Sequence, residues 1–122
     1  MSNSTGHAVV NPFLQAKMRL IRRGWCKFAR HSPTHQCCLI GSLEERIPGT
    51  KRYKMIKEPN EHNLVSFLAD VIYHNTGYKR ESPYHTVTGY NDNSDRNQIE
   101  VVKILNIAIN KWDKEQKGES NE

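Results

Sequence analysis

A chain of 122 residues has the length of a single domain, and its 25% charged and 36% hydrophobic residues are typical of a globular protein rather than a disordered one. No stretch approaches the ~18 consecutive apolar residues of a membrane span, and residues 1–10 lack the pattern of a secretion signal, so we expect a cytoplasmic protein with no membrane partner. Three cysteines, two of them adjacent, do not form the paired framework of a secreted mini-protein, so we expect free thiols.

The net charge of +5 is unevenly distributed along the chain. Residues 1–57 carry 11 Lys and Arg against two acids, a charge of +9, whereas residues 58–122 carry seven against 11, a charge of −4. Such a charge difference between the two halves is typical of a surface that binds a polyanion or an acidic partner. It is equally typical of two halves of one fold that attract each other.

Residues 1–10 are small and polar, which predicts a flexible arm. Asn11 and Pro12 then make a favourable helix start, because proline at the first helical position gives up an N–H that has no partner there. The apolar residues that follow recur at helical spacing and predict an amphipathic basic helix, interrupted near Gly24, whose apolar face is Phe13, Leu14, Met18, Ile21, Trp25 and Phe28.

The middle of the chain predicts short elements. Residues 30–36 contain Pro33 and two histidines and are expected to form a loop, and the dense apolar cluster of residues 37–43 predicts a short buried helix. Residues 47–50, Ile-Pro-Gly-Thr, predict a turn, and residues 51–57 an exposed loop or a weak edge strand.

Two longer helices are predicted in the C-terminal half. One follows Pro59, with Asn60 as its N-cap, ends at Gly77 and buries Leu64, Phe67, Leu68, Val71 and Ile72. The other begins at Asp95, with Gln98 completing its cap, and buries Ile99, Val102, Leu105, Ile109 and Trp112.

Together these elements predict a mostly α fold. Three or four helices pack around one core in a domain of residues 11–113, and residues 114–122 form a frayed tail. The connection at residues 78–93 is polar, and its residues 84–88 are the one segment with strand character. Any sheet is therefore expected to be a small hairpin of residues 51–57 with residues 84–88.

Three segments stand out along the chain: Gly24-Trp25, the Cys-Leu-Ile-Gly-Ser-Leu run of residues 38–43, and Tyr90-Asn91-Asp92 followed by Arg96 and an apolar helix. Together they resemble a family of small bacterial and phage proteins of unknown function. The family's pattern is similar, with a Trp after a basic helix, a Cys-Leu-x-Gly-Ala-Leu segment, and an aromatic-Asn-Asp before an Arg. The likeness spans residues 14–112 and implies one compact domain without indicating a mechanism, and His31, His35 and His85 lie outside the pattern.

Cysteine and histidine cluster between residues 26 and 38, and thiolates and imidazoles are the ligands that zinc prefers. One alternative is therefore a structural zinc-binding domain with ligands drawn from Cys26, His31, His35, Cys37 and Cys38. The spacing argues against it, because adjacent cysteines rarely bind one ion together and no second Cys-x-x-Cys or His-x-x-x-His pair completes the set. Our main expectation is no metal and no cofactor, with buried thiols beside solvated histidines.

A small thiol-dependent enzyme is a second alternative. Cys37 or Cys38 opens a short predicted helix whose N-terminus favours a thiolate. Cys38, His85 and Asn91 (or Asp92) then follow in the chain order that papain-like enzymes use for nucleophile, base and orienting group. Order alone is weak support, because a chain with six histidines offers many such triples, so an enzyme is the less favoured hypothesis.

Our first hypothesis is a binding protein that uses a basic N-terminal surface. Phosphate contacts need only well-placed cations, and Trp25, Tyr53 and His31 are present to stack on a base. The partner is expected to be a nucleic acid, a nucleotide or an acidic protein. The basic residues concerned are Arg19, Arg22, Arg23, Lys27, Arg30, Lys51, Arg52 and Lys54, with Lys17 and Lys57 beside them.

The polar run of residues 90–96, ahead of the last helix, is expected to be structural. Asn, Asp and Ser are the residues that helix caps require, and Glu100 lies too near to complete an EF-hand calcium loop. Asp92 is expected to pair with Arg96 or with the basic first helix. A clasp between the oppositely charged halves is then formed by Trp25, Asn91, Asp92 and Arg96.

Overall fold

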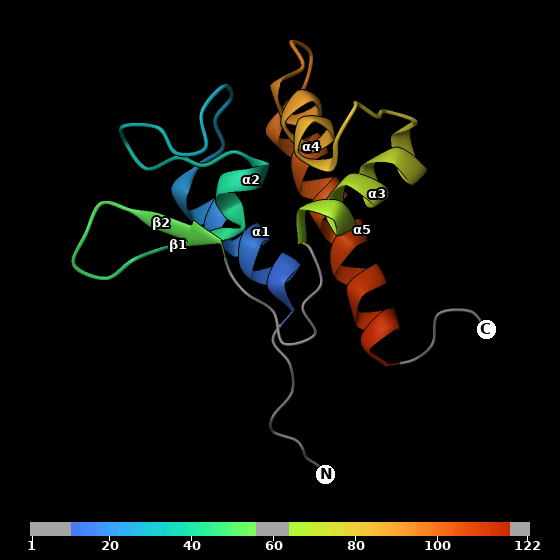
Figure 1. The fold of residues 1–122 in the computed structure, drawn as a ribbon, viewed down its shortest axis with the longest axis horizontal. Coiled ribbons are helices and arrows are strands. Elements are labelled where there is room, and N and C mark those ends of the chain that lie inside the picture. The colour runs from blue at the N-terminus through green and yellow to red at the C-terminus, as the bar shows by residue number, and fades with distance from the viewer. Residues whose placement is uncertain (1–10, 56–63, 118–122) are drawn as a thin grey trace.

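The computed structural model describes residues 11–55 and 64–117, which form five helices and one two-stranded antiparallel sheet (Figure 1). The elements are α1 Pro12–Arg23, α2 Leu39–Ser42, β1 Glu44–Arg46, β2 Tyr53–Met55, α3 Leu64–Thr76, α4 Pro83–Asp92 and α5 Gln98–Gln116. The mostly α fold with a small hairpin is thereby confirmed. Residues 114–116, expected in a frayed tail, belong to α5. Outside the described ranges lie the expected arm at residues 1–10, Lys57, Asn60 and residues 118–122.

Helix α1 begins and ends at strong local signals. The Asn11 side chain caps its start by accepting the backbone N–H of Phe13 at 2.9 Å. Gly24 ends it with a φ of 95°, a conformation that residues with a Cβ rarely adopt. Trp25 and Phe28 were predicted on the helix face but lie in the loop that follows, and the Phe28 side chain is 78% exposed.

The buried face of α1 differs from the predicted one. The fully buried apolar stripe consists of Phe13, Ala16 and Leu20. A second apolar stripe is 41–51% exposed and consists of Leu14, Met18 and Ile21. The prediction was wrong for this second stripe, because helical periodicity does not say which of two apolar faces the rest of the chain covers.

The hairpin forms across the predicted turn at residues 47–50. Strands β1 and β2 pair antiparallel, with Glu44 opposite Met55 and Arg46 opposite Tyr53. The weak edge strand expected around Tyr53 is therefore present, but its partner precedes the turn. The hairpin and the loop before α2 extend from one side of the helices (Figure 1).

Residues 84–88 were predicted as the partner strand and lie instead inside α4, which corrects that prediction. Ser82 caps α4 by accepting the backbone N–H of His85 at 3.1 Å, and Pro83 occupies the first helical position. Packing against α3 then buries Thr86 and Val87. The cap and this burial together outweigh the strand propensity of the β-branched residues.

Helix α3 has the predicted buried face, whereas that of α5 is shifted. All five predicted apolar positions of α3 are buried, and the helix ends before Gly77, which has a φ of 80°. Helix α5 is capped by Asn97 rather than Asp95, because Asn97 and Glu100 exchange side-chain-to-backbone hydrogen bonds. Ile99 is 73% exposed, and the buried positions of α5 are Val101, Ile104, Leu105, Ala108 and Trp112.

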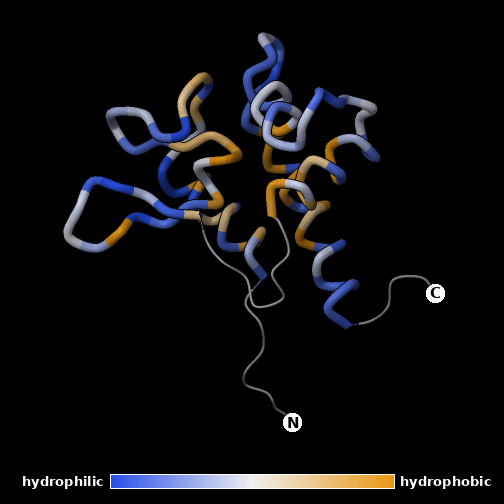
Figure 2. Tube along the Cα trace, in the orientation of Figure 1, coloured by the Kyte–Doolittle hydropathy of each residue, from blue (hydrophilic) through white to orange (hydrophobic). Residues whose placement is uncertain are grey.

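The core lies where α1, α3 and α5 meet. The Phe13 and Phe67 rings stack with their centroids 5.0 Å apart, and the Trp112 ring contacts both edge-on. The Asn11 amide also donates to the Ile109 carbonyl at 3.0 Å, which joins the start of α1 to the end of α5. Apolar stretches of the helices face inward, and the largely hydrophilic hairpin extends away from them (Figure 2).

Candidate functional site

A pocket of about 390 Å³ lies between the outer face of α1 and the hairpin. Helix α1 contributes residues spaced three and four apart, which share one face, and the hairpin contributes both of its strands. Four lining residues are arginines and one is a carboxylate, so the lining carries a formal charge of +3 with histidine neutral. The lining residues are Gln15, Met18, Arg19, Arg22, Arg23, His35, Glu45, Arg46 and Tyr53.

Three of these arginines are held in place by backbone carbonyl oxygens. The pairs are Arg19 Nη1 with Ser42 O at 3.0 Å, Arg23 Nε with His35 O at 2.9 Å, and Arg46 Nε with Thr50 O at 2.8 Å. A neutral carbonyl orients a guanidinium without cancelling its charge. Because each guanidinium has five N–H donors, further donors remain for an anion in the pocket.

Arg19 and Arg22 differ in how far their charge is offset. Arg19 Nη2 lies 3.2 Å from Glu45 Oε2, and burial lowers the pKa of its guanidinium against the opposing effect of that carboxylate. Arg22 is exposed and makes no hydrogen bond or ion pair with another residue of the described ranges. Arg22 is therefore the pocket cation with the most to gain from a bound anion.

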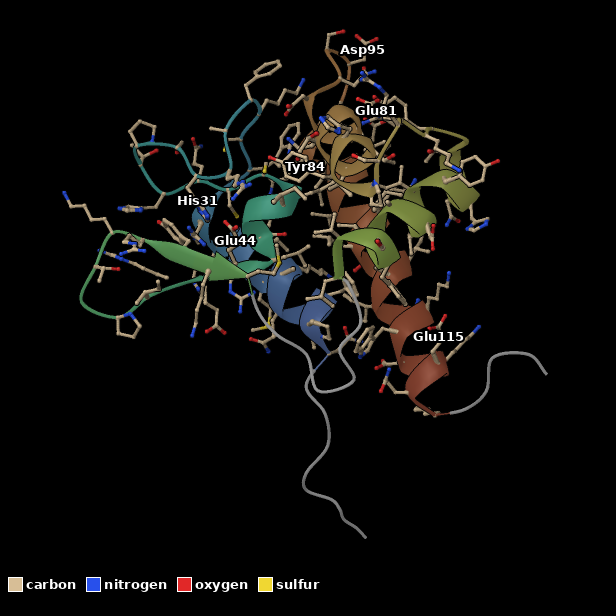
Figure 3. The ribbon with its side chains drawn as sticks, viewed as in Figure 1. His31, Glu44, Glu81, Tyr84, Asp95 and Glu115 are labelled. Carbon is tan, nitrogen blue, oxygen red and sulfur yellow. The ribbon has the colours of Figure 1, made fainter. Side chains whose placement is uncertain are left out.

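Behind the pocket, His31 links Arg23 to a buried carboxylate. His31 Nε2 lies 2.8 Å from Glu44 Oε1, and His31 Nδ1 lies 2.9 Å from Arg23 Nη2; His31 and Glu44 are close together in Figure 3. Because a guanidinium only donates, Nδ1 accepts and Nε2 carries the proton, so the imidazole is neutral. Burial lowers the pKa of His31 from its ordinary value of 6.5, against the opposing effect of Glu44.

Tyr53, which lines the pocket, is held in place by His31 and His35. The Tyr53 and His31 rings stack with centroids 3.5 Å apart and planes inclined by 9°. The Tyr53 hydroxyl lies 2.8 Å from His35 Nδ1. Tyr53 therefore has its ring and its hydroxyl in defined positions, although it belongs to a three-residue strand.

The predicted basic residues lie in different surroundings. Lys27 donates to two backbone carbonyl oxygens just after α4, at 2.7 and 3.2 Å. Arg30 pairs with Glu44 at 3.3 Å and lies over the Tyr84 ring, 5.5 Å from its centroid. Three residues are exposed on the hairpin or its turn, namely Lys51, Arg52 and Lys54. Three others line the pocket, namely Arg19, Arg22 and Arg23.

Apart from Met18, which was predicted on the apolar face of the helix, four pocket residues were absent from the predicted basic surface, namely Gln15, His35, Glu45 and Arg46. Of these four, Arg46 is the residue whose place in the pocket could have been predicted from the sequence. Pairing the strands across the turn at residues 47–50 places Arg46 opposite Tyr53, an expected stacking residue. The other three are not marked by any local pattern, because the packing of the hairpin on α1 brings them together.

Asn91 joins the loop after α1 to α4. Its side chain is fully buried, and Oδ1 accepts the Trp25 indole N–H at 2.6 Å and the Leu39 backbone N–H at 3.0 Å. Its Nδ2 donates to the Cys26 carbonyl at 3.1 Å and to Asp92 Oδ1 at 2.9 Å. One amide thereby satisfies backbone and side-chain groups from three separate parts of the chain.

Asp92 and Arg96, the other predicted clasp residues, act separately. Asp92 Oδ1 accepts the Phe28 backbone N–H at 2.9 Å, so it holds the loop rather than an arginine. Arg96 lies 3.6 Å above the Tyr90 ring centroid and pairs with Glu100 at 3.5 Å. The structure thus brings Trp25, Asn91 and Asp92 together and uses Arg96 within the C-terminal half.

The cysteine and histidine candidates lie in different surroundings. Cys37 and Cys38 are buried in the core, and burial raises the pKa of each thiol to about 11, which opposes a thiolate. The His85 ring is exposed at the start of α4, with Nδ1 2.6 Å from Ser82 Oγ, and the Asn91 amide is occupied as described above. Cys38 does cap α2, with Sγ accepting the Gly41 backbone N–H at 3.4 Å, but burial outweighs this contact and keeps the pKa of the thiol raised.

Within residues 11–55 and 64–117, no three His, Cys, Asp or Glu side chains are grouped closely enough to hold a metal ion. The zinc ligand set of Cys26, His31, His35, Cys37 and Cys38 is therefore not assembled. His31 and His35 contact Arg23, Glu44 and Tyr53 instead, because the loop wraps around the end of α1.

None of the helices in the described parts of the chain is long and apolar enough to cross a bilayer. No curated protein and no solved structure matches the chain. A family model does match, over residues 5–111, a range that includes α1, the hairpin, the pocket and the Asn91 contacts. The chain belongs to this family of unknown function, DUF6197.

Proposed function

We propose that the protein is a binding protein for a phosphate-bearing ligand and that the pocket between α1 and the hairpin is its binding site. The observation that carries the proposal is that Arg19, Arg23 and Arg46 are each held by a backbone carbonyl oxygen. Guanidinium groups held in this way bind phosphate oxygens with little further loss of side-chain freedom. Arg22, an exposed residue of the same lining, supplies an additional cation.

A ligand enclosed by the pocket is favoured over an extended nucleic-acid strand. The volume of about 390 Å³ falls in the range of small-molecule sites. A strand needs a continuous row of cations along its backbone, whereas Lys27 and Arg30 are engaged outside the pocket by carbonyl oxygens and by Glu44.

The proposal is tested by titrating the full chain with inorganic pyrophosphate in a calorimeter. We expect Arg22→Gln to weaken binding about tenfold, the effect of one charged hydrogen bond. The matched control is Arg80→Gln, which removes the same charge from an exposed arginine outside the pocket, and we expect it to bind like the wild type. Thermal unfolding checks that both variants fold.

Equal affinities of the wild type and Arg22→Gln would contradict the proposal, as would an absence of pyrophosphate binding. A single-stranded oligonucleotide is titrated in parallel. Tight binding that is lost in Lys54→Gln but kept in Arg22→Gln would place the site on the exposed hairpin and overturn the assignment to the pocket.

A further inference from the structure

The pocket contains one carboxylate among its four arginines. Glu45 Oε2 pairs with Arg19, but the side chain is 53% exposed and Oε1 makes no hydrogen bond with any residue of the described ranges. The Gln15 amide lies in the same lining. The pocket therefore offers hydrogen-bond acceptors beside its cationic donors.

A carboxylate disfavours a bare anion. It repels phosphate oxygens, and at neutral pH it can only accept hydrogen bonds. A ligand that also carries hydroxyl groups turns this repulsion into an attraction, because a hydroxyl donates to a carboxylate in a charge-assisted bond. Met18 and Tyr53 supply apolar surface in the same pocket for a carbon skeleton.

We infer that the ligand is a small phosphate monoester whose alcohol portion bears free hydroxyl groups, and that Glu45 is the residue that selects it over inorganic phosphate. The inference rests on the proposed function and adds the ligand class. The phosphate contacts Arg22, Arg23 and Arg46, and the hydroxyl groups donate to Glu45. A sugar phosphate and the ribose phosphate part of a mononucleotide share this chemistry.

The test compares the dissociation constants of inorganic phosphate, ribose 5-phosphate and adenosine 5′-monophosphate for the full chain, at about pH 7.5, where phosphate monoesters are mainly dianions. We expect the wild type to prefer ribose 5-phosphate over phosphate about tenfold, and Glu45→Ala to lose that preference. We also expect Glu45→Ala to bind phosphate more tightly, because a repelling charge is removed. Tighter binding of the nucleotide than of ribose 5-phosphate identifies a nucleotide, and equal binding identifies a sugar phosphate.

Glu81→Gln is the matched control, because Glu81 is an exposed carboxylate outside the pocket, and we expect it to keep the preference. If Glu45→Ala fails to fold, Glu45→Gln replaces it, with a smaller loss of preference. Equal affinity of the wild type for phosphate and ribose 5-phosphate, or a preference that survives in Glu45→Ala, overturns this inference alone. Failure of all three probes to bind also overturns this inference, and the proposed function is overturned with it only if pyrophosphate fails to bind as well.

Discussion

His31 receives contacts from three elements. Arg23 of α1, Glu44 of β1 and Tyr53 of β2 all meet its ring, and Arg30 adds a positive charge nearby. The hydrogen bond from Arg23 needs the lone pair of Nδ1, so a proton at Nδ1 would face a guanidinium. Holding Arg23 and Tyr53 in the pocket therefore depends on a neutral imidazole.

We expect the free energy of unfolding to fall as the pH drops below 6.5, the ordinary pKa of histidine. Burial lowers the pKa of His31 in the folded protein, so the unfolded chain takes up a proton that the folded chain resists, and stability decreases with falling pH. Above pH 6.5 this contribution is constant. Urea unfolding between about pH 5 and 8 measures it.

His31→Gln should flatten this part of the pH profile, because glutamine does not titrate. The control is His74→Gln, which removes an exposed imidazole on α3 and should leave the slope unchanged. A wild-type slope equal to that of His31→Gln over the same range would contradict the role given to His31.

At the scale of elements, the loop after α1 depends on Asn91 of α4 for hydrogen bonds at both of its ends. The Asn91 amide accepts from Trp25 and Leu39 and donates to Cys26, so it fixes both ends of the loop. The same loop carries His35 to the pocket and His31 to its place behind it. The contacts of α4 with this loop therefore help to position the pocket.

We expect Asn91→Ala to lower the free energy of unfolding by roughly 3 kcal/mol, because several polar groups in a buried place lose their partners. Asn110→Ala, at an exposed position of α5, is the control and should change stability by less than about 0.5 kcal/mol. Chemical denaturation measures both. A loss no larger than that of the control would show that water replaces the Asn91 contacts without cost.

The elements also show what the sequence could predict. The buried face of α3 was predictable because its apolar residues make one stripe. Helix α1 has two stripes, and only the packing of α5 decides between them. Helix α4 was missed because Val87 and its β-branched neighbours have strand propensity, while the Ser82 cap and the contact with α3 favour a helix.

The candidate site was predictable to a similar degree. Arg19, Arg22 and Arg23 follow from the basic helix. Glu45 and Arg46 line the pocket because the hairpin packs on α1, and no local sequence pattern predicts that packing.

At the scale of the whole molecule, the reactivity of the buried thiols measures how often the core opens. Burial raises the pKa of Cys37 and Cys38 to about 11 from 9.0, so these thiols stay protonated in the folded protein. We expect a thiol reagent to modify only the partly exposed Cys26 rapidly, and to reach the other two at the rate of unfolding. We also expect stability to be lost as the pH rises from 9 towards 11, because unfolded thiols ionise first.

Counting reactive thiols against time checks this prediction, and Cys26→Ser should remove the rapid phase. Rapid modification of all three thiols under native conditions would show that the residues around α2 open independently of the core.

The contact between α1 and α5 also governs when the protein can fold during its synthesis. Asn11 and the carbonyl it binds on α5 are 98 positions apart. At the ~5–20 residues per second of translation, α5 is made on the order of 5–20 s after the start of α1. Over that interval the Phe13 side of α1 lacks Trp112 and the rest of α5, so the core closes only after the last helix has been made.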